Sequence, residues 1–555
     1  MADASYDAIV IGGGANGLLV ALYLQDAGMQ TAVFERNMEI GGGLCGDEVP
    51  LPGFLTNTCA TNVRFYTTPC YEDFNLGKYG LKQIFPKAGQ GMIFDDETCL
   101  VTYPVYEVVD TDTGRTERSK ENLEKTLREI SRFSERDAEM AADLLDRVES
   151  GWKKAYRDYM FNPPTPWGTP DPLEKLLDDP SNGLEPRWSV MTGTEMAFEL
   201  FESPEMQCYW LRALQTSTGN WPDDVLGLFN LVHTVMTALN ITPPATVMGG
   251  SHSVAHAMQR AFVERGGKFF VASEIEKILC ENGKAKAVRT VHGDEVEARQ
   301  LVVSDVDVNQ TLLRFIGEEN FDHKLVRKIK NIRYDRMCGA LWGTLALHEQ
   351  PIYKAAAFNP DCNAMPRTLV GPKDPFYLSE MQKYEAHMYG VPKKLCWFAG
   401  PDSIWDKTRV PQGKHLLQIE QYTGEMRFLP QSRWAELRRE YPKELVKQYQ
   451  IYAENMTEDN VIDSYFDTCM ETSKKNINYI NSNVSVGAMV ISQMGRFRPI
   501  PELAYYKTPI DNLFLCSATT HVGGGIRGSC GYNAYKTIAE QYGLKKQWEE
   551  KGRSY

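Results

Sequence analysis

The segment DAIVIGGGANGLLVALYL, residues 7–24, decides the fold of this chain. Its apolar start predicts a β-strand that runs into the GGGANG turn, and the apolar residues after the turn predict a helix. A second strand over 31–34 ends in Glu35, about twenty residues on, where a dinucleotide-binding βαβ unit carries an acid. A turn that merely needs glycine requires neither the helix nor the acid, so we predict a Rossmann-type α/β domain.

Each glycine of the turn has a predicted role. Gly12 permits the tight turn, Gly14 lets backbone N–H groups approach a pyrophosphate at the positive end of the helix, and Gly17 lets helix and strand pack closely. Glu35 is expected to accept hydrogen bonds from ribose hydroxyls and to repel a 2′-phosphate. A second glycine-rich block, HVGGGIRG, occupies 521–528. Two such blocks at opposite ends of the chain predict that it is wrapped around an FAD.

The length of 555 residues exceeds what one hydrophobic core usually organises, so we expect two interleaved domains. The FAD-binding domain is predicted to be discontinuous, and a mixed-sheet and helical substrate domain is predicted to fill the gaps. The FAD-binding domain is assigned residues 1–90, 245–310 and 485–555, and the substrate domain 91–244 and 311–484.

Composition excludes several classes of partner. The net charge of −13 argues against a nucleic-acid partner, and no apolar run reaches the 18 or so residues that a membrane span needs. The twelve cysteines include no CxxC pair, which predicts free thiols in a reducing compartment. We therefore expect a cytoplasmic protein, leave peripheral contact with a membrane open, and predict no oligomeric state.

Four blocks, spread over nearly the whole chain, resemble the phytoene dehydrogenase-like branch of FAD-dependent oxidoreductases, in the carotenoid desaturase and amine oxidase superfamily. They are DAIVIGGGANGLLVALYL, GGSHSVAHAMQRAFVERGGKFF with its ASEIEKIL strand, PDSIWDKTRVPQGKHLL, and YKTPIDNLFLCSATTHVGGGIRGSCGYNA. The resemblance implies a glutathione-reductase-like FAD-binding domain. The residues that it places at the cofactor are Gly12, Gly14, Ala15, Asn16, Gly17, Glu35, Arg36, Gly42, Gly43, Leu44, Ile275, Gly524, Gly525 and Ile526.

The last block departs from the family pattern at three positions. Ser517 stands where the family usually has glycine, Val522 where proline usually follows the histidine, and Cys530 where proline is common. These departures lie near the expected active site and suggest specialised chemistry. A covalent link between Cys530 and the flavin lacks a matching attachment motif, so a buried free thiol is the favoured interpretation.

Few residues are candidates for catalysis. His521 could relay a proton or could only orient its loop, and Arg527 could stabilise negative charge on a reduced flavin or a substrate, or hold a FAD phosphate. Arg64 and Tyr66 could point into the substrate space, although packing roles are favoured.

His252 and His256 are four apart on one predicted helix, as in a metal-binding pair. No acid lies between them in an HExxH arrangement, so we predict no metal.

The function predicted from the sequence is hydride transfer from a largely apolar, unsaturated or cyclic organic substrate to flavin N5. Two alternatives remain open: a flavin-dependent double-bond isomerase without net redox change, and a non-catalytic protein stabilised by FAD. A second GxGxxG unit with its own acid is not visible, so a bound nicotinamide is not expected. The electron acceptor would then be oxygen, a quinone or a carrier protein.

Overall fold

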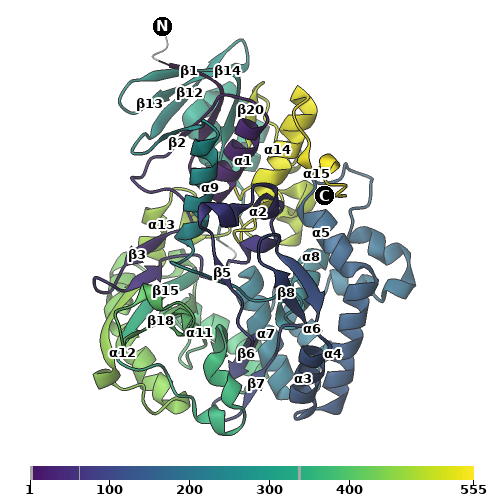
Figure 1. The fold of residues 1–555 in the computed structure, drawn as a ribbon, viewed down its shortest axis with the longest axis vertical. Coiled ribbons are helices and arrows are strands. Elements are labelled where there is room, and N and C mark those ends of the chain that lie inside the picture. Colours follow the sequence, from purple (N-terminus) through teal and green to yellow (C-terminus); the bar gives the residue numbers. More distant parts are fainter. Residues whose placement is uncertain (1–3, 62, 336–338) are drawn as a thin grey trace.

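The computed structural model describes residues 4–61, 63–335 and 339–555, and two seven-stranded sheets organise them (Figure 1). In the first sheet the strand order is β11-β2-β1-β14-β13-β12, with β20 beside β14. Its strands are β1 (Ala4–Ile11), β2 (Thr31–Phe34), β11 (Lys268–Phe270), β12 (Ile275–Glu281), β13 (Lys284–Thr290), β14 (Glu295–Ser304) and β20 (Leu513–Leu515).

The predicted βαβ unit is present at the centre of this sheet. β1 lies between β2 and β14 and runs parallel to both, and β11 and β20 extend the parallel part on either side. The hydrophobic run of β1 is buried on both faces, as expected for a parallel strand that helices cover. Helix α1 (Ala15–Asp26) packs against α9 (His252–Glu264) and α14 (Ser529–Tyr542), which come from distant parts of the sequence (Figure 1).

The second sheet has the order β19-β15-β18-β17-β16-β6-β7 and is antiparallel except where β16 pairs with β6. Its strands are β6 (Gln90–Ile93), β7 (Cys99–Val101), β15 (Gly339–Leu347), β16 (Arg367–Val370), β17 (Trp397–Gly400), β18 (His415–Thr423) and β19 (Val461–Asp467). The long helix α12 (Gln431–Tyr452) buries Trp434, Tyr441 and Tyr449 in the apolar cluster of this sheet.

A group of helices lies beside the second sheet, on the right of Figure 1. Its members are α3 (Lys120–Ser131), α4 (Glu135–Arg147), α5 (Lys153–Met160), α6 (Gly193–Leu200), α7 (Pro204–Thr218) and α8 (Gly227–Ala238). Ser119 and Ser134 accept the backbone N–H of Asn122 and Asp137 as N-caps. The proline-rich FNPPTPWGTPDP segment, residues 161–172, forms no helix, because proline lacks the N–H that a helix interior needs.

Short elements connect these parts. The two-stranded ribbons are β3 (Gly46–Glu48) with β4 (Leu55–Asn57), β5 (Gln83–Ile84) with β10 (Thr246–Val247), and β8 (Tyr106–Asp110) with β9 (Arg115–Arg118). The remaining α-helices are α2 (Pro69–Asp73), α10 (His323–Lys330), α11 (Gln382–Tyr389), α13 (Cys469–Lys475) and α15 (Gln547–Glu550).

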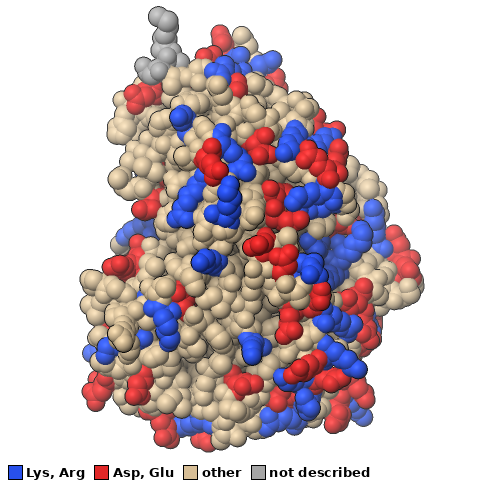
Figure 2. All heavy atoms as spheres, viewed as in Figure 1, with Lys and Arg blue, Asp and Glu red and all other residues tan. Residues whose placement is uncertain are grey.

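The surface carries charges of both signs. Figure 2 shows Lys and Arg intermixed with Asp and Glu on the face of Figure 1, above all over the helical side. The acidic surplus is therefore not gathered in one patch on this face. No helix among the described residues combines the length and apolar character that crossing a bilayer requires.

Candidate functional site

The GGGANG turn joins β1 to α1 with the geometry that its glycines were predicted to provide. Gly12 has a φ of +98°, which a branched residue would adopt only with strain. A Cβ at Gly17 would overlap the carbonyl oxygen of Gly12, so only glycine allows this approach of helix to strand. At Gly14 an added Cβ would instead overlap the Oδ2 atom of Asp305.

Two buried carboxylates bind the backbone of this turn. Glu35 accepts the N–H of Gly13 with Oε2 and the N–H of Asn37 with Oε1, each at 2.8 Å. Asp305, directly after β14, accepts the N–H of Gly17 at 3.0 Å. Burial raises the pKa of both carboxyl groups, and the nearby charge of Glu35 raises that of Asp305 further. Sequence analysis missed Asp305, because its role depends on β14 lying beside β1.

The other two glycine segments meet the turn in space. An added Cβ at Gly42 would lie 3.3 Å from the Cα of Gly14, and one at Gly43 would lie 3.0 Å from the Cδ1 of Ile526. Ile526 has a φ of +50°, an unusual conformation for a β-branched residue and one that clusters at functional sites. Glycine segments from both ends of the chain thus line one region.

The remaining residues predicted at the cofactor surround this region. Asn16 accepts the N–H of Gly531 with its side-chain oxygen, which brings the starts of α1 and α14 together. The backbone that leads into Ile275 runs beside the end of β2, because the N–H of Ser273 binds the carbonyl of Glu35. Three further side chains differ in exposure: Ala15 and Leu44 are buried and Arg36 is exposed. Gly524 is buried, whereas Gly525 is exposed.

His521 is fully enclosed. Its Nε2 lies 2.8 Å from the carbonyl oxygen of Tyr159 and therefore donates to it, and its ring packs edge-on against the Tyr159 ring at 4.7 Å. Its Nδ1 has no partner among the described residues. Burial, with a smaller effect of the Arg498 charge, lowers the pKa of His521 to about 4. A ring with so low a pKa is a weak base, and its Nε2–H is already donated to Tyr159, which favours the loop-orienting alternative over proton relay.

Arg527 begins a hydrogen-bonded chain. Its Nη2 donates to the Nε2 of His233 on α8 at 2.6 Å, so the Nδ1 of His233 carries the proton and donates to the Tyr156 hydroxyl at 2.8 Å. Burial and nearby arginine charges hold the pKa of His233 well below its usual value. Sequence analysis missed His233, which sits in the apolar run LVHTVM and gives no local signal.

The side chains of Arg64 and Tyr66 differ in whether their polar atoms have hydrogen-bond partners. The Tyr66 hydroxyl donates to the carbonyl of Pro243 at 2.8 Å, so this side chain is held in a packing role. The Nε and Nη2 atoms of Arg64 are shielded from solvent and have no partner within the described chain. Burial and the charges of Arg367 and Arg527 lower the pKa of Arg64 to about 10.

Arg498 holds the second glycine block in place. It is fully buried, and its guanidinium donates to backbone carbonyls of two segments, 485–493 and 518–520. Gly523 lies against it, 3.0 Å from the guanidinium carbon to the position of an added Cβ. No motif predicted this role, because the carbonyls become neighbours only in the fold.

Cys530 is buried at the start of α14. Its thiol donates to the carbonyls of Gly523 and Thr520 at 3.4 and 3.6 Å, and burial raises its pKa. A protonated thiol is a poor nucleophile. These contacts support the interpretation as a free buried thiol.

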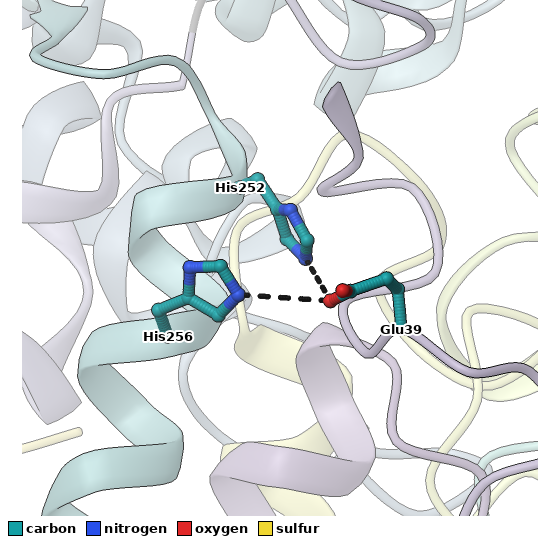
Figure 3. Close-up of side chains that lie close together, drawn as sticks. All are labelled: Glu39, His252 and His256. Carbon is teal, nitrogen blue, oxygen red and sulfur yellow. Dashed lines mark ion pairs between the residues drawn. The ribbon is translucent and has the colours of Figure 1, made fainter. Parts of the chain in front are cut away.

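A histidine pair lies at the edge of the glycine region. His252 and His256 stand one turn apart on α9, and the carboxylate of Glu39 faces both rings from a neighbouring segment (Figure 3). The Oε2 atom of Glu39 is 3.8 Å from the Nε2 atom of each histidine. The prediction of no metal rested on the absence of a local acid, and the structure supplies an acid from another segment.

Comparisons with known proteins extend this description. The model of the NAD(P)-binding Rossmann-like domain matches residues 10–71. A limonene dehydrogenase chain of Castellaniella defragrans is 25% identical, with 98% of this chain and 96% of the relative covered. A 4,4'-diapophytoene desaturase of Methylomonas sp is 25% identical over 53% of each chain.

Solved structures share the fold at low identity. An oxidoreductase from Methanosarcina mazei has a TM-score of 0.57 at 14% identity, over 96% of this chain and 99% of that one. Cyclohexylamine oxidase from Brevibacterium oxydans has a TM-score of 0.53 at 16% identity, over 97% and 99%. The sequence relatives thus confirm that the chain is an oxidoreductase related to the phytoene dehydrogenase-like enzymes, and the solved structures share its fold.

Proposed function

We propose that this chain is an FAD-dependent enzyme that removes a hydride from a largely apolar organic substrate, unsaturated or cyclic at the reacting carbon. The observation that carries the proposal is the meeting of the three glycine segments, around residues 12–17, 41–43 and 523–526, in one region. Bound FAD would supply the hydride acceptor at its ring. The relatives named for limonene and 4,4'-diapophytoene support an apolar substrate.

We assign cofactor binding to the first sheet and substrate binding to the domain that contains the second sheet. The first sheet provides the GGGANG turn and Glu35, which suit the pyrophosphate and ribose of a dinucleotide. The strands of the first sheet come from residues 4–34, 268–304 and 513–515, and those of the second from 90–101 and 339–467. This separation supports the proposed division into an FAD-binding and a substrate domain.

Around the second glycine block the chain excludes water and holds charge. Tyr159 and Phe229 stack at 5.1 Å, and Tyr159 also covers His521. Arg527, held by His233, places a fixed positive charge beside the glycine loop, where it would stabilise negative charge. His521 is proposed to orient the loop, because its Nε2–H is already donated to Tyr159.

The proposal is tested with the purified protein. Heat release of the cofactor followed by mass measurement should give one FAD per chain, and finding FMN or no flavin would refute the assignment. An anaerobic screen of apolar and aromatic compounds should then find one that bleaches the flavin band. Product formed only after prior reduction of the flavin, without net consumption of reductant, would identify the isomerase instead. Oxygen, quinones and carrier proteins are compared as acceptors in the same assay.

A further inference from the structure

Three arginines near the second glycine block, Arg64, Arg367 and Arg527, form what we call the arginine cluster; Arg367 is buried, and Arg64 and Arg527 are half-buried. Arg527 contacts His233 directly through the 2.6 Å hydrogen bond from its Nη2, and the charges of Arg64 and Arg367 also act on this histidine and lower its pKa. The Nε atoms of Arg64 and Arg367 and the Nη2 of Arg64 are shielded from water, and no described residue accepts their hydrogen bonds.

The cluster carries more positive charge than its surroundings neutralise. Glu420 is the acid whose charge raises the pKa of Arg367, and it also interacts with Arg212, which lies outside the cluster. Arg409 shows the usual solution for a buried arginine in this chain, since it forms an ion pair with Asp402. A buried charge without a partner is strongly unfavourable, and buried donors without acceptors add to that penalty.

We infer that the arginine cluster binds an anionic group of the substrate, most simply a carboxylate, while the apolar part of the same molecule is presented for oxidation. This inference rests on the proposed function and narrows its substrate class. A guanidinium fork suits a carboxylate, because two parallel N–H groups match its two oxygens.

Two other ligands of the cluster have to be considered, an amine substrate and the phosphates of FAD. A protonated amine would be repelled by the three positive charges of the cluster. We therefore do not expect an amine substrate, although the chain shares its fold with cyclohexylamine oxidase. The phosphates of FAD are a second source of negative charge. Arg367 lies on β16 in the second sheet, whereas the GGGANG turn predicted for the pyrophosphate lies on the first. The position of Arg367 therefore favours the substrate.

The test uses the FAD-loaded protein and simple probes. Octanoate, octanamide and octylamine share an eight-carbon chain and end in a carboxylate, a neutral amide and an ammonium group. Their binding is measured by perturbation of the flavin spectrum and by calorimetry. Octanoate should bind about 10- to 100-fold more tightly than octanamide, the ratio that charge-assisted hydrogen bonds provide. Arg367→Met should remove this preference and leave the affinity for octanamide unchanged. Arg265→Met removes a half-buried arginine that pairs with Asp26 outside the cluster, and it is the control.

Each contrary outcome has a distinct meaning. Equal binding of octanoate and octanamide would overturn the inference, as would a preference that survives in Arg367→Met. Loss of FAD from Arg367→Met, with no carboxylate preference in the wild type, would assign the cluster to the cofactor. Absence of flavin from the purified wild type would refute the proposed function instead, and calorimetry would still report the carboxylate preference.

The group of Glu39, His252 and His256 carries a second, independent inference. One ligand atom from each residue lies within 4.8 Å of the other two, and the histidine rings are 4.1 Å apart (Figure 3). Metal–ligand bonds of about 2.0–2.2 Å place ligand atoms roughly 3–3.5 Å apart, so small side-chain movements suffice. The carbonyl oxygen of Ile40 lies 2.9 Å from the Nε2 of His252 and offers a fourth ligand once that nitrogen loses its proton.

We propose that these residues bind a divalent transition-metal ion such as Zn²⁺, which would fasten the loop before Gly41 to α9. Two neutral imidazoles and a carboxylate are a usual zinc ligand set. Helix α9 already contacts this loop, because the Cβ of Ala255 lies 3.1 Å from the position of a Cβ added at Gly41. An ion here would therefore hold one side of the glycine region.

Calorimetric titration of chelator-treated holoprotein with ZnCl₂ tests this site. We expect one ion per chain with micromolar affinity or better, and at least a tenfold loss in both His256→Ala and Glu39→Gln. His323→Ala removes an exposed histidine at another place and should have no effect. No stoichiometric binding below about 100 µM, or equal binding by His256→Ala, would overturn the site.

Discussion

Replacement of Arg498 tests how the second glycine block is held. Its five N–H groups are distributed over the carbonyls of residues 485–488, 493, 518 and 520. The shortest of these bonds, from Nη2 to the carbonyl of Ala518, is 2.7 Å. The two segments have no comparable link to each other among the described residues, so we expect the loop that leads to His521 to depend on this one side chain.

The expected magnitude follows from the number of donors. Lysine keeps the charge but has only three N–H groups, so Arg498→Lys leaves at least two carbonyl contacts unmade. At about 1.5–3 kcal/mol for each hydrogen bond to a charged group, the loss is about 3–6 kcal/mol. Arg498→Met removes all five donors, and its loss approaches the whole stability of a typical domain, about 5–15 kcal/mol.

Thermal unfolding, followed by FAD release and by tryptophan fluorescence, measures this effect. The predicted FAD-binding domain, residues 1–90, 245–310 and 485–555, is of the size that loses about 2–4 °C in Tm for each kcal/mol, so the Tm of Arg498→Lys should fall by at least about 6 °C. Arg333→Lys changes an exposed arginine to lysine and controls for the substitution itself. An Arg498→Lys protein that binds FAD and unfolds within about 2 °C of the wild type would show that the carbonyls are held by other means.

Four further predictions concern single residues. Gly14→Val should abolish FAD binding, because the new side chain would overlap Asp305; a folded, yellow variant would contradict this. Glu35→Gln should weaken FAD binding by about 1–3 kcal/mol, measured by cofactor titration, and unchanged affinity would place the ribose elsewhere. His521→Ala should slow flavin reduction by less than the roughly 100-fold expected for a lost proton relay. Because burial lowers the pKa of His521 to about 4, the pH profiles of wild type and variant should be parallel from pH 5 to 9. A bell-shaped profile of the wild type that is lost in the variant would instead support the relay. Burial raises the pKa of Asp307 to about 7, above an unfolded value of about 3.9. The folded state therefore binds the additional proton between about pH 4 and 7, and the free energy of unfolding should fall as the pH rises through this range. Asp307→Asn should flatten this pH dependence in urea titrations.

The sequence predicted the parts of the fold whose signal is local. The strand, turn and acid around Gly12 and Glu35 follow from short-range periodicity and from positions that only glycine can occupy, and the structure has them within a few residues. The N-caps Ser119 and Ser134 carry the same kind of local signal, a serine directly before a helix. Asp305 and Arg498 were not found, because their partners are backbone groups that become neighbours only after folding.

The arginine cluster shows why overall charge predicts so little about a buried site. The net charge of −13 counts every charged side chain of the sequence, and it argues against an extended polyanion because such a partner would meet a chain with an overall negative charge. A single carboxylate bound inside the protein responds instead to the few charges around it, where water is excluded and screening is weak. Arg367 and Arg64 are far apart in the sequence and belong to no motif. The pairing of β16 with β6 places Arg367 beside Gln90. The side-chain amide of Gln90 is also buried without a partner among the described residues. An acidic chain can therefore contain a cationic binding site, and only the arrangement of its strands makes that site visible.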